Sequence, residues 1–398
     1  MRTSIDKRGP RPDRRARRLL GLSAAGLAAC SLIVAGCARS SQIGPPIPAK
    51  QQDASASFDS NELRSIGYSR GWRAYPIVTR SQSVELVRAF DDIVLVLEGG
   101  STLSCIDAQG GASRWSTQLE SPVTPFLGIA RRGNLVYVNS SSELYVLDAL
   151  SGELRARQAL PLVVTTGPTR HEGQLLFGCA DGQIFSWVPT QEIKLWGNQL
   201  DHPVDMDAIM VDGIAAFVST QGDVLFIDPA RGTAVMRAGG GQRFNALFDG
   251  PGAMPATAPG MLLVPSEDQS LWAFTPASSR NLWRVPTEGP ITSRPVVHGD
   301  HVFIDLPSLG FSAVNLGTGE VDWSLADVGG ELVAVRDKLL VVFDADNEVL
   351  TQIDGPTGDV FGSVRVGGVS RVETAELEDS PIYLITDRGL VARFNPDA

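Results

Sequence analysis

Histidine is the residue of this sequence best suited to acid–base or metal chemistry at neutral pH, and its four copies are dispersed. His171 and His202 stand alone, whereas His298 and His301 flank a Gly-Asp turn, which is typical of a solvated hairpin rather than a metal pair. The sequence also lacks H-E-x-x-H, G-x-S-x-G and a phosphate-binding glycine loop with its lysine. We therefore expect no catalytic residues and no metal site.

Cys105 and Cys179 are the two cysteines of the region expected to fold. They are 74 positions apart, in different copies of the repeat described below, and each lies within an apolar, strand-like run. A free buried cysteine behaves as a small apolar residue. We predict both to be core residues rather than a disulfide or metal ligands.

The N-terminus has the pattern of an export signal. Four arginines between residues 14 and 18 precede an apolar stretch over residues 19–36, the order found in signal peptides. The stretch ends in Val34-Ala35-Gly36-Cys37, which resembles the bacterial lipobox, whose cysteine sulfur receives diacylglycerol. We predict a lipoprotein-type signal peptide over residues 1–36 and lipid attachment at Cys37. The alternative is an uncleaved transmembrane anchor, because about 18 apolar residues approach the minimum for spanning.

Residues 37–67 are polar, rich in Pro, Ser and Gln, and show no apolar period. We therefore predict a flexible, lipid-anchored tether that lets the folded body reach a partner. Ala38 and Arg39 follow the cysteine, and the lack of Asp at that point resembles lipoproteins sorted to the outer membrane. The expected location is thus a bacterial membrane, with the outer membrane facing the periplasm as the first choice.

Charge divides the chain into two parts. Residues 1–36 carry eight Lys or Arg and two Asp, a balance of +6, so the remainder of a chain with a total of −11 carries −17. Such an acidic body repels nucleic acid and favours basic partner surfaces. We expect protein partners and no DNA or RNA.

One pattern recurs about every forty residues. Each copy is a strand, a turn centred on Gly, Pro or Ser, and a second strand that usually ends in a large residue. The copies lie at residues 103–115, 144–156, 184–196, 224–236, 271–283, 311–323 and, in weaker form, 350–361. Another strand precedes each copy and the approach segment supplies a fourth, so each repeat predicts one four-stranded antiparallel blade of a β-propeller.

The two ends of the repeat region complete each other. The C-terminal residues reach only the third strand of a last blade, while Trp72 lies 43 residues, one repeat period, before Trp115. We therefore predict an all-β, eight-bladed propeller over residues 68–398, closed by pairing of the N-terminal strand with three C-terminal strands. Closure removes free sheet edges. The recurrent tryptophans are predicted to fill the wedge that opens between neighbouring blades at the rim.

These copies resemble the pyrroloquinoline-quinone-type propeller repeat, A-x-D-x-x-T-G-x-x-x-W. The best copy runs from Ala313 to Trp323, with Asn315 in place of the usual aspartate. The resemblance covers roughly residues 68–395. It implies the propeller fold and little about function, because one fold serves unrelated tasks.

Within that superfamily, the order of lipobox, short tether and propeller is similar to that of the BamB family, lipoprotein subunits of the outer-membrane protein assembly complex. The resemblance implies a non-catalytic scaffold whose loops on one face bind the periplasmic domains of the assembly barrel. It places those loops at residues 160–168 and 202–207, where Asp205 and Asp207 match an acidic pair of the family. The family's arginine has no counterpart among Val163, Val164 and Thr165. Another envelope protein or a glycan is the alternative partner.

Quinone-dependent dehydrogenases are the enzymatic relatives of this repeat. By resemblance, such an enzyme needs an adjacent-cysteine disulfide beside its cofactor, carboxylate and amide ligands for calcium, and an aspartate base. This sequence has no Cys-Cys pair, and blades joined mostly by short loops use up its length. We therefore expect no quinone or other cofactor, and a quinoprotein dehydrogenase remains the alternative function.

The longest departure from the period is the Gly- and Pro-rich segment 238–260. Long loops on rigid folds often carry recognition, although a tolerated surface insertion is the plainer interpretation. If the segment binds a partner, Arg243 and Phe244 are the predicted anchor pair.

Overall fold

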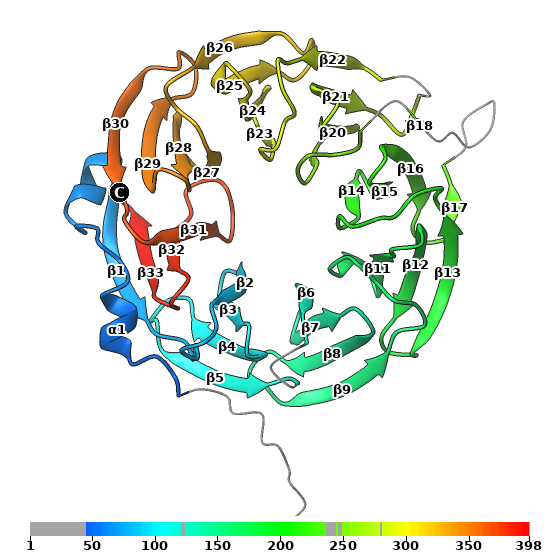
Figure 1. The fold of residues 1–398 in the computed structure, drawn as a ribbon, viewed down its shortest axis with the longest axis horizontal. Helices are drawn as coiled ribbons and strands as arrows, with labels where there is room; N and C mark the ends of the chain where they lie inside the picture. Colours follow the sequence, from blue (N-terminus) through cyan, green and yellow to red (C-terminus); the bar gives the residue numbers. More distant parts are fainter. Residues whose placement is uncertain (1–44, 121–123, 236–243, 246–248, 279–280, 398) are drawn as a thin grey trace, which may run out of the picture. The chain divides into compact units, whose positions relative to one another are not determined.

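The computed structural model describes residues 45–397 except 121–123, 236–243, 246–248 and 279–280. In this part of the chain, eight antiparallel sheets follow one another around a ring (Figure 1). Seven sheets are built from consecutive strands, and the eighth joins strands from both ends. The predicted all-β, eight-bladed propeller is confirmed.

The first four blades each run from an innermost to an outermost strand. Blade 1 contains β2 (Val84–Ala89), β3 (Ile93–Glu98), β4 (Thr102–Asp107) and β5 (Ser113–Gln118). Blade 2 contains β6 (Phe126–Arg132), β7 (Leu135–Ser140), β8 (Glu143–Asp148) and β9 (Leu154–Ala159). Blade 3 contains β10 (Thr169–His171), β11 (Gln174–Gly178), β12 (Gln183–Val188) and β13 (Ile193–Gln199). Blade 4 contains β14 (Ile209–Val211), β15 (Ile214–Val218), β16 (Asp223–Asp228), β17 (Thr233–Ala234) and β18 (Phe244–Asn245).

The other four blades follow the same order. Blade 5 contains β19 (Ala256–Ala258), β20 (Met261–Ser266), β21 (Ser270–Phe274) and β22 (Trp283–Pro286). Blade 6 contains β23 (Val296–His298), β24 (His301–Leu306), β25 (Gly310–Asn315) and β26 (Val321–Leu325). Blade 7 contains β27 (Glu331–Arg336), β28 (Leu339–Asp344), β29 (Val349–Asp354) and β30 (Val360–Arg365). Blade 8 contains β31 (Val369–Thr374), β32 (Ile382–Thr386), β33 (Val391–Pro396) and β1 (Tyr68–Ala74).

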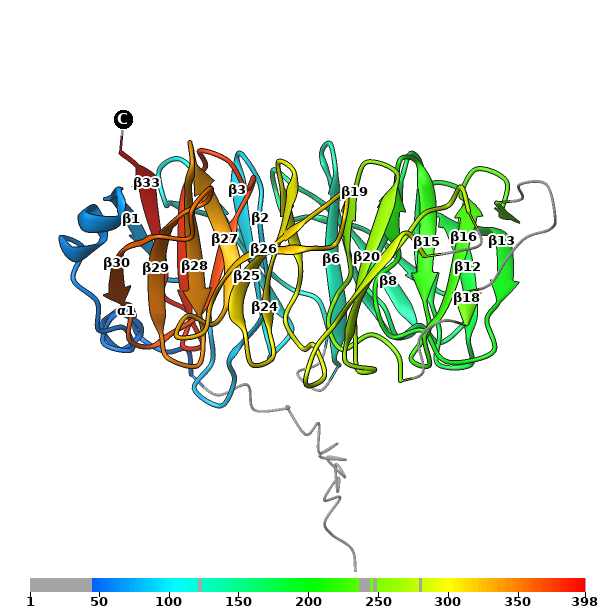
Figure 2. The same cartoon turned by 90° about the horizontal axis from the view of Figure 1, so that it is seen from above.

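The middle strands of the blades are the apolar runs of the sequence. In blade 1, β3 is buried at every position, whereas the outermost strand β5 is exposed or half-buried except at Trp115. A strand covered on both faces needs continuous apolar residues, and the blades supply that cover by packing face to face (Figure 2). The core is accordingly a series of apolar clusters between adjacent blades.

Five tryptophans each connect one blade with the next. The indole Nε1 donates a hydrogen bond of 2.7–3.0 Å to a backbone carbonyl of the following blade. Each ring covers a glycine of positive φ, where a Cβ would come within 2.9 Å of the indole. The pairs are Trp72–Gly111, Trp115–Gly152, Trp196–Gly232, Trp283–Gly319 and Trp323–Gly358. The prediction that the repeat tryptophans fill the wedge between blades is confirmed.

Two of the other blades have a different residue at this position, and the corresponding residue of blade 4, Met236, lies outside the described part of the chain. Blade 2 has alanine there, and Gln158 instead donates to the Pro189 carbonyl at 2.7 Å and accepts a hydrogen bond of 2.9 Å from Trp187 Nε1. In blade 7 the position is Phe361, which is 62% exposed. The 3₁₀ helix η1 (Glu62–Ile66) packs against β30 in its place.

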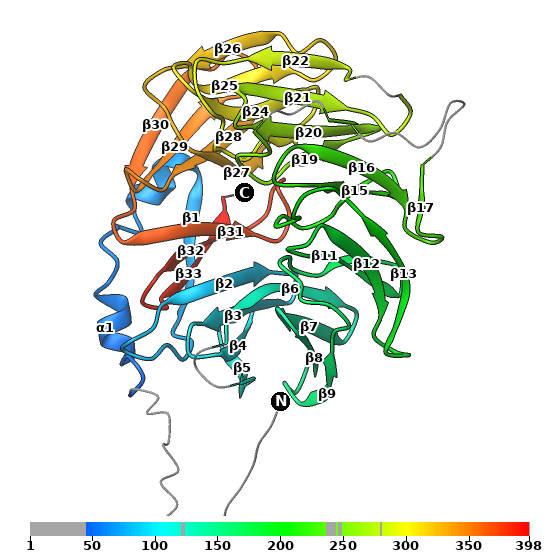
Figure 3. The ribbon, with the colours of Figure 1, turned by 45° about the vertical axis from the view of Figure 1, so that its right-hand side comes forward.

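The predicted closure by the N-terminal strand is confirmed. β1 pairs antiparallel with β33, with Tyr68 opposite Pro396, and Figure 3 shows these strands side by side. From blade 7, the Arg336 guanidinium donates hydrogen bonds to the backbone carbonyls of Gly67 and Asp397. A ladder of main-chain hydrogen bonds therefore seals the ring, and one arginine holds both segments of the seam.

The prediction of a flexible tether is wrong for residues 45–67. This segment contains helix α1 (Ala49–Asp53) and η1. The Ile47 N–H donates a hydrogen bond of 2.7 Å to the Val78 carbonyl, which ties the segment to the propeller. Leu63 and Ile66 are fully buried. A few well-spaced apolar side chains order the segment because the seam of blade 8 offers them an apolar surface. No helix in the described part of the chain is long and apolar enough to cross a membrane.

Candidate functional site

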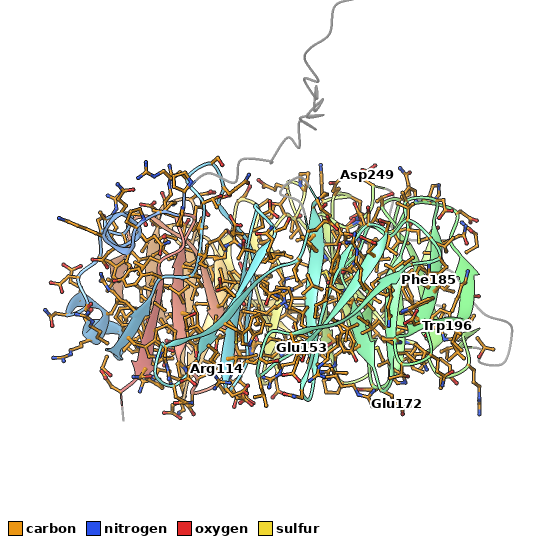
Figure 4. The ribbon with its side chains drawn as sticks, turned by 90° about the horizontal axis from the view of Figure 1, so that it is seen from below. Arg114, Glu153, Glu172, Phe185, Trp196 and Asp249 are labelled. Carbon is orange, nitrogen blue, oxygen red and sulfur yellow. The ribbon has the colours of Figure 1, made fainter. Side chains whose placement is uncertain are left out.

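The connections between strands lie on two faces of the ring. The blade-joining face carries the connection from each outermost strand to the next blade, and the turns between second and third strands. The hairpin face carries the remaining turns. In Figure 4, Asp249 lies on the blade-joining face, and Glu153 and Glu172 lie toward the hairpin face.

The two loops that the sequence assigns to partner binding meet on the blade-joining face. The connections 160–168 and 200–208 flank blade 3. The Thr165 hydroxyl donates to the Val204 carbonyl, and the Val204 N–H donates to the Cys179 carbonyl at 3.0 Å. Residues some forty positions apart in the sequence thus form one continuous surface.

The four loop residues singled out from the sequence divide into two pairs. Val163 is 64% exposed, and Asp205 is also exposed. Val164 is buried, and the Asp207 carboxylate accepts a hydrogen bond of 2.6 Å from the Gly167 N–H. Burial raises the pKa of Asp207 above its usual value, and this hydrogen bond opposes the rise. Val163 and Asp205 are available to a partner, whereas Val164 and Asp207 shape the loops.

We expect Asp207→Ala to lower the free energy of unfolding by about 1–3 kcal/mol, because it leaves the buried Gly167 N–H without its acceptor. Asp205→Ala, two positions away and exposed, is the control and should change it by less than about 0.5 kcal/mol. Urea unfolding followed by tryptophan fluorescence measures both. Equal losses in the two variants would contradict the structural role of Asp207.

His202 has a partner that its isolated position in the sequence did not indicate. Its Nδ1 lies 2.7 Å from Asp223 Oδ2, and the Asp223 side chain is only 3% exposed. The Ser219 hydroxyl donates to the same carboxylate oxygen at 3.1 Å. The interaction fixes the 200–208 connection against blade 4. No sequence pattern reveals it, because two residues 21 positions apart meet only through the fold.

His298 and His301 are both half-buried and have separate acidic partners. His298 lies 3.1 Å from Glu378 and His301 lies 2.8 Å from Asp322. Among the residues that the structure describes, no group of three or more His, Cys, Asp or Glu side chains is arranged to hold a metal ion. His298 ends β23 and His301 begins β24, so the two flank a turn at residues 299–300, as the sequence predicts.

The anchor pair predicted in the insertion falls partly outside the described residues. Arg243 lies outside them. Phe244 and Asn245 form β18, whose backbone pairs with Val224 and Asp223 of β16. The insertion thus returns to the edge of blade 4, and a binding role for Arg243 and Phe244 stays a prediction.

A cavity of about 1090 Å³ lies inside the ring beside blades 6, 7 and 8. Its charged lining consists of seven carboxylates and three guanidinium groups. These residues are Asp305, Asp327, Glu331, Asp344, Asp346, Glu373, Glu376, Arg88, Arg294 and Arg371. The wall is therefore acidic and polar.

A quinone cofactor does not fit these residues. Pyrroloquinoline quinone carries three carboxylates, which an acidic wall repels. Cys105 and Cys179 are free and buried in different blades, as predicted, so they form no disulfide beside the cavity. Burial raises the pKa of each thiol to about 12, which leaves neither as a thiolate near neutral pH.

Comparison with known proteins identifies the repeat. The model of one family, described as outer membrane protein assembly factor BamB, matches residues 69–243, 180–337 and 220–391. No curated protein matches the chain.

Two of the solved structures that share the fold are a BamB protein and a designed protein. BamB from Moraxella catarrhalis has a TM-score of 0.63 and 15% identity, covering 82% of this chain and 99% of that one. The computationally designed Ika8 protein has a TM-score of 0.64 and 14% identity, covering 81% of this chain and 99% of its own. At these identities the structures show the fold alone, whereas the family model spans most of the propeller. The chain belongs to the family of the outer membrane protein assembly factor BamB.

Proposed function

We propose that this protein is a non-catalytic scaffold of the bacterial envelope, anchored by a lipid at Cys37, that holds a protein partner during outer-membrane protein assembly. The observation that carries the proposal is the match of the BamB family model to three overlapping stretches between residues 69 and 391. The proposed partner is the assembly barrel, with another envelope protein as the alternative.

The blade-joining face supports this role. The exposed Val163 and Asp205 lie on two connections that hydrogen-bond to each other, so a partner meets an apolar and an acidic contact on a fixed surface. Rigid surfaces of this kind lose little conformational entropy on binding. The formal charge of −17 after residue 36 favours a basic partner and disfavours nucleic acid.

In-cell photo-crosslinking tests the binding face. A photoreactive amino acid at Val163 or Asp205 of the full chain, expressed in its own bacterium, should give an adduct that contains the assembly barrel. The same amino acid at Glu172, exposed on the hairpin face, is the control and should give none. Adducts with a different envelope protein would overturn the assignment to outer-membrane assembly. Absence of any adduct at both loop positions would overturn the binding face.

The lipid anchor is tested at Cys37. We expect Cys37→Ser to abolish incorporation of labelled palmitate and to move the protein from the membrane to the soluble fraction, because the variant lacks the residue that would carry the acyl chains of the anchor. Cys30→Ser, within the same apolar stretch, is the matched control and should change neither. A Cys37→Ser protein that stays in the membrane would favour the transmembrane anchor instead.

A further inference from the structure

One loop of blade 8 differs from its counterparts and crosses the hairpin-face end of the cavity. The turn between first and second strands has two or three residues in seven blades, whereas the β31–β32 connection runs from Ala375 to Pro381. It turns inward toward β27 (Figure 1). Residues 374–377 form part of the cavity lining.

The β31–β32 connection is fixed to two neighbouring blades. The Val335 N–H donates to the Leu377 carbonyl at 2.8 Å, and the Asp379 N–H donates to the Val335 carbonyl at 2.9 Å. Glu378 lies 3.1 Å from His298 of blade 6. Leu377 packs against the apolar cluster between blades 6 and 7. The connection therefore forms the floor of the cavity at the hairpin face.

The opposite end of the cavity lies at the blade-joining face. Its rim consists of connections and turns of that face, at residues 292–294, 307–308, 326–330 and 344–347. Asp327 and Asp346 are exposed on this rim. The cavity thus opens on the face that also carries Val163 and Asp205.

Two ion pairs line the wall between rim and floor. Arg294 lies 3.7 Å from Glu331, at the start of β27, and Arg88 lies 3.9 Å from Glu373, near the end of β31. Both separations exceed hydrogen-bonding distance, so neither carboxylate accepts a hydrogen bond from its arginine at this distance. Burial raises the pKa of Glu331 and Glu373, and the nearby arginines only partly oppose the rise. A further cation beside these carboxylates would favour their charged form.

We propose that this cavity is a binding pocket for a basic loop of the protein partner, whose Lys or Arg side chains bind to Glu331 and Glu373. The inference rests on the proposed scaffold function and adds the chemistry of the bound segment. A volume of about 1090 Å³ accommodates several residues, since pockets for small ligands measure about 300–1,000 Å³. The excess of carboxylates on the wall and rim selects a basic segment.

The test uses the full-length protein in detergent and fluorescein-labelled peptides of sequence Gly-Arg-Gly-Arg-Gly and Gly-Gln-Gly-Gln-Gly. Fluorescence anisotropy should show the arginine peptide binding at least about tenfold more tightly, a difference of about 1.4 kcal/mol. The double variant Glu331→Gln, Glu373→Gln should lose most of this preference. The control Glu153→Gln, Glu172→Gln removes the same charge from the hairpin face and should keep it (Figure 4).

Three outcomes would overturn the pocket. These are equal affinity for both peptides, unchanged affinity in the Glu331 and Glu373 variant, and an equal loss in the hairpin-face control, which would indicate attraction to the acidic body as a whole. Thermal melting checks that the variants fold. Should the wall variant unfold, Asp327→Asn with Asp346→Asn removes two exposed rim charges and should weaken arginine-peptide binding at least about threefold.

The crosslinking experiment separates the two proposals. A crosslink between Val163 and the assembly barrel, together with equal affinity for the arginine and glutamine peptides, would overturn the pocket and leave the scaffold function intact. A preference for the arginine peptide, together with adducts to a different envelope protein, would overturn the proposed partner and leave the pocket's preference for a basic segment intact.

Discussion

Trp115→Ala should lower the free energy of unfolding by about 3–5 kcal/mol, the range for truncating a large buried aromatic side chain. Trp115 is only 9% exposed and donates a hydrogen bond of 2.9 Å to the Ala149 carbonyl of blade 2. Its removal leaves a gap between blades 1 and 2 and an unsatisfied carbonyl. Urea unfolding, followed by circular dichroism to avoid the altered fluorescence, measures the loss.

Phe361→Ala is the matched control for Trp115→Ala. Phe361 occupies the corresponding repeat position in blade 7, but it is 62% exposed. Truncating the Phe361 side chain should lower the free energy of unfolding by less than about 1 kcal/mol, because the side chain buries little apolar surface. A comparable loss in both variants would show that the aromatic repeat position stabilises strands locally and that contact with the next blade contributes little.

Gly152→Ala should destabilise the protein by about 2–5 kcal/mol, through two additive effects. Gly152 has a φ of 71°, where any residue with a Cβ costs about 1–2 kcal/mol. A Cβ would also lie 2.4 Å from the Trp115 ring, and the resulting overpacking costs about 1–3 kcal/mol more. The indole is then displaced from the turn that it covers.

Gly133→Ala separates these two effects. Gly133 also has a positive φ, of 55°, but nothing lies within 4 Å of the position of its Cβ. Only the backbone cost of about 1–2 kcal/mol should therefore remain. The difference in the loss of unfolding free energy between the two variants measures the cost of steric overlap between the added Cβ and the Trp115 indole. Identical values would refute a steric role for that contact.

The N-terminal segment shows where prediction from local composition fails. Residues 45–67 are polar and without an apolar period, which predicts a flexible tether, yet Leu63 and Ile66 are fully buried. Blade 7 ends in an exposed phenylalanine rather than a docked tryptophan, so η1 packs against β30 there. The sequence contains the apolar residues, but the surface that receives them exists only after blades 7 and 8 have formed.

The two loops that the sequence assigns to partner binding lie together in the fold, but only some of the residues singled out in them are exposed, and their binding role stays a prediction. The resemblance to the BamB family places the loops at 160–168 and 202–207, and the fold joins them by the contact of Thr165 with Val204. Within the loops, Val163 is exposed and Val164 is buried. Adjacent residues of an irregular loop point in opposite directions, and no periodic pattern assigns those directions in advance.

The sequence by itself determined the number of blades, the strands within them and the closure of the ring. Those features depend on patterns that can be read along the chain: apolar runs of strand length, turns, and a repeat of about forty residues that usually ends in a large residue, most often tryptophan. The tertiary structure alone decided the pairing of His202 with Asp223, the packing of residues 45–67 and the acidic cavity with its floor. The physical reason is that burial and charge neutralisation depend on neighbours from other blades, which are set by the geometry of the ring rather than by position along the chain.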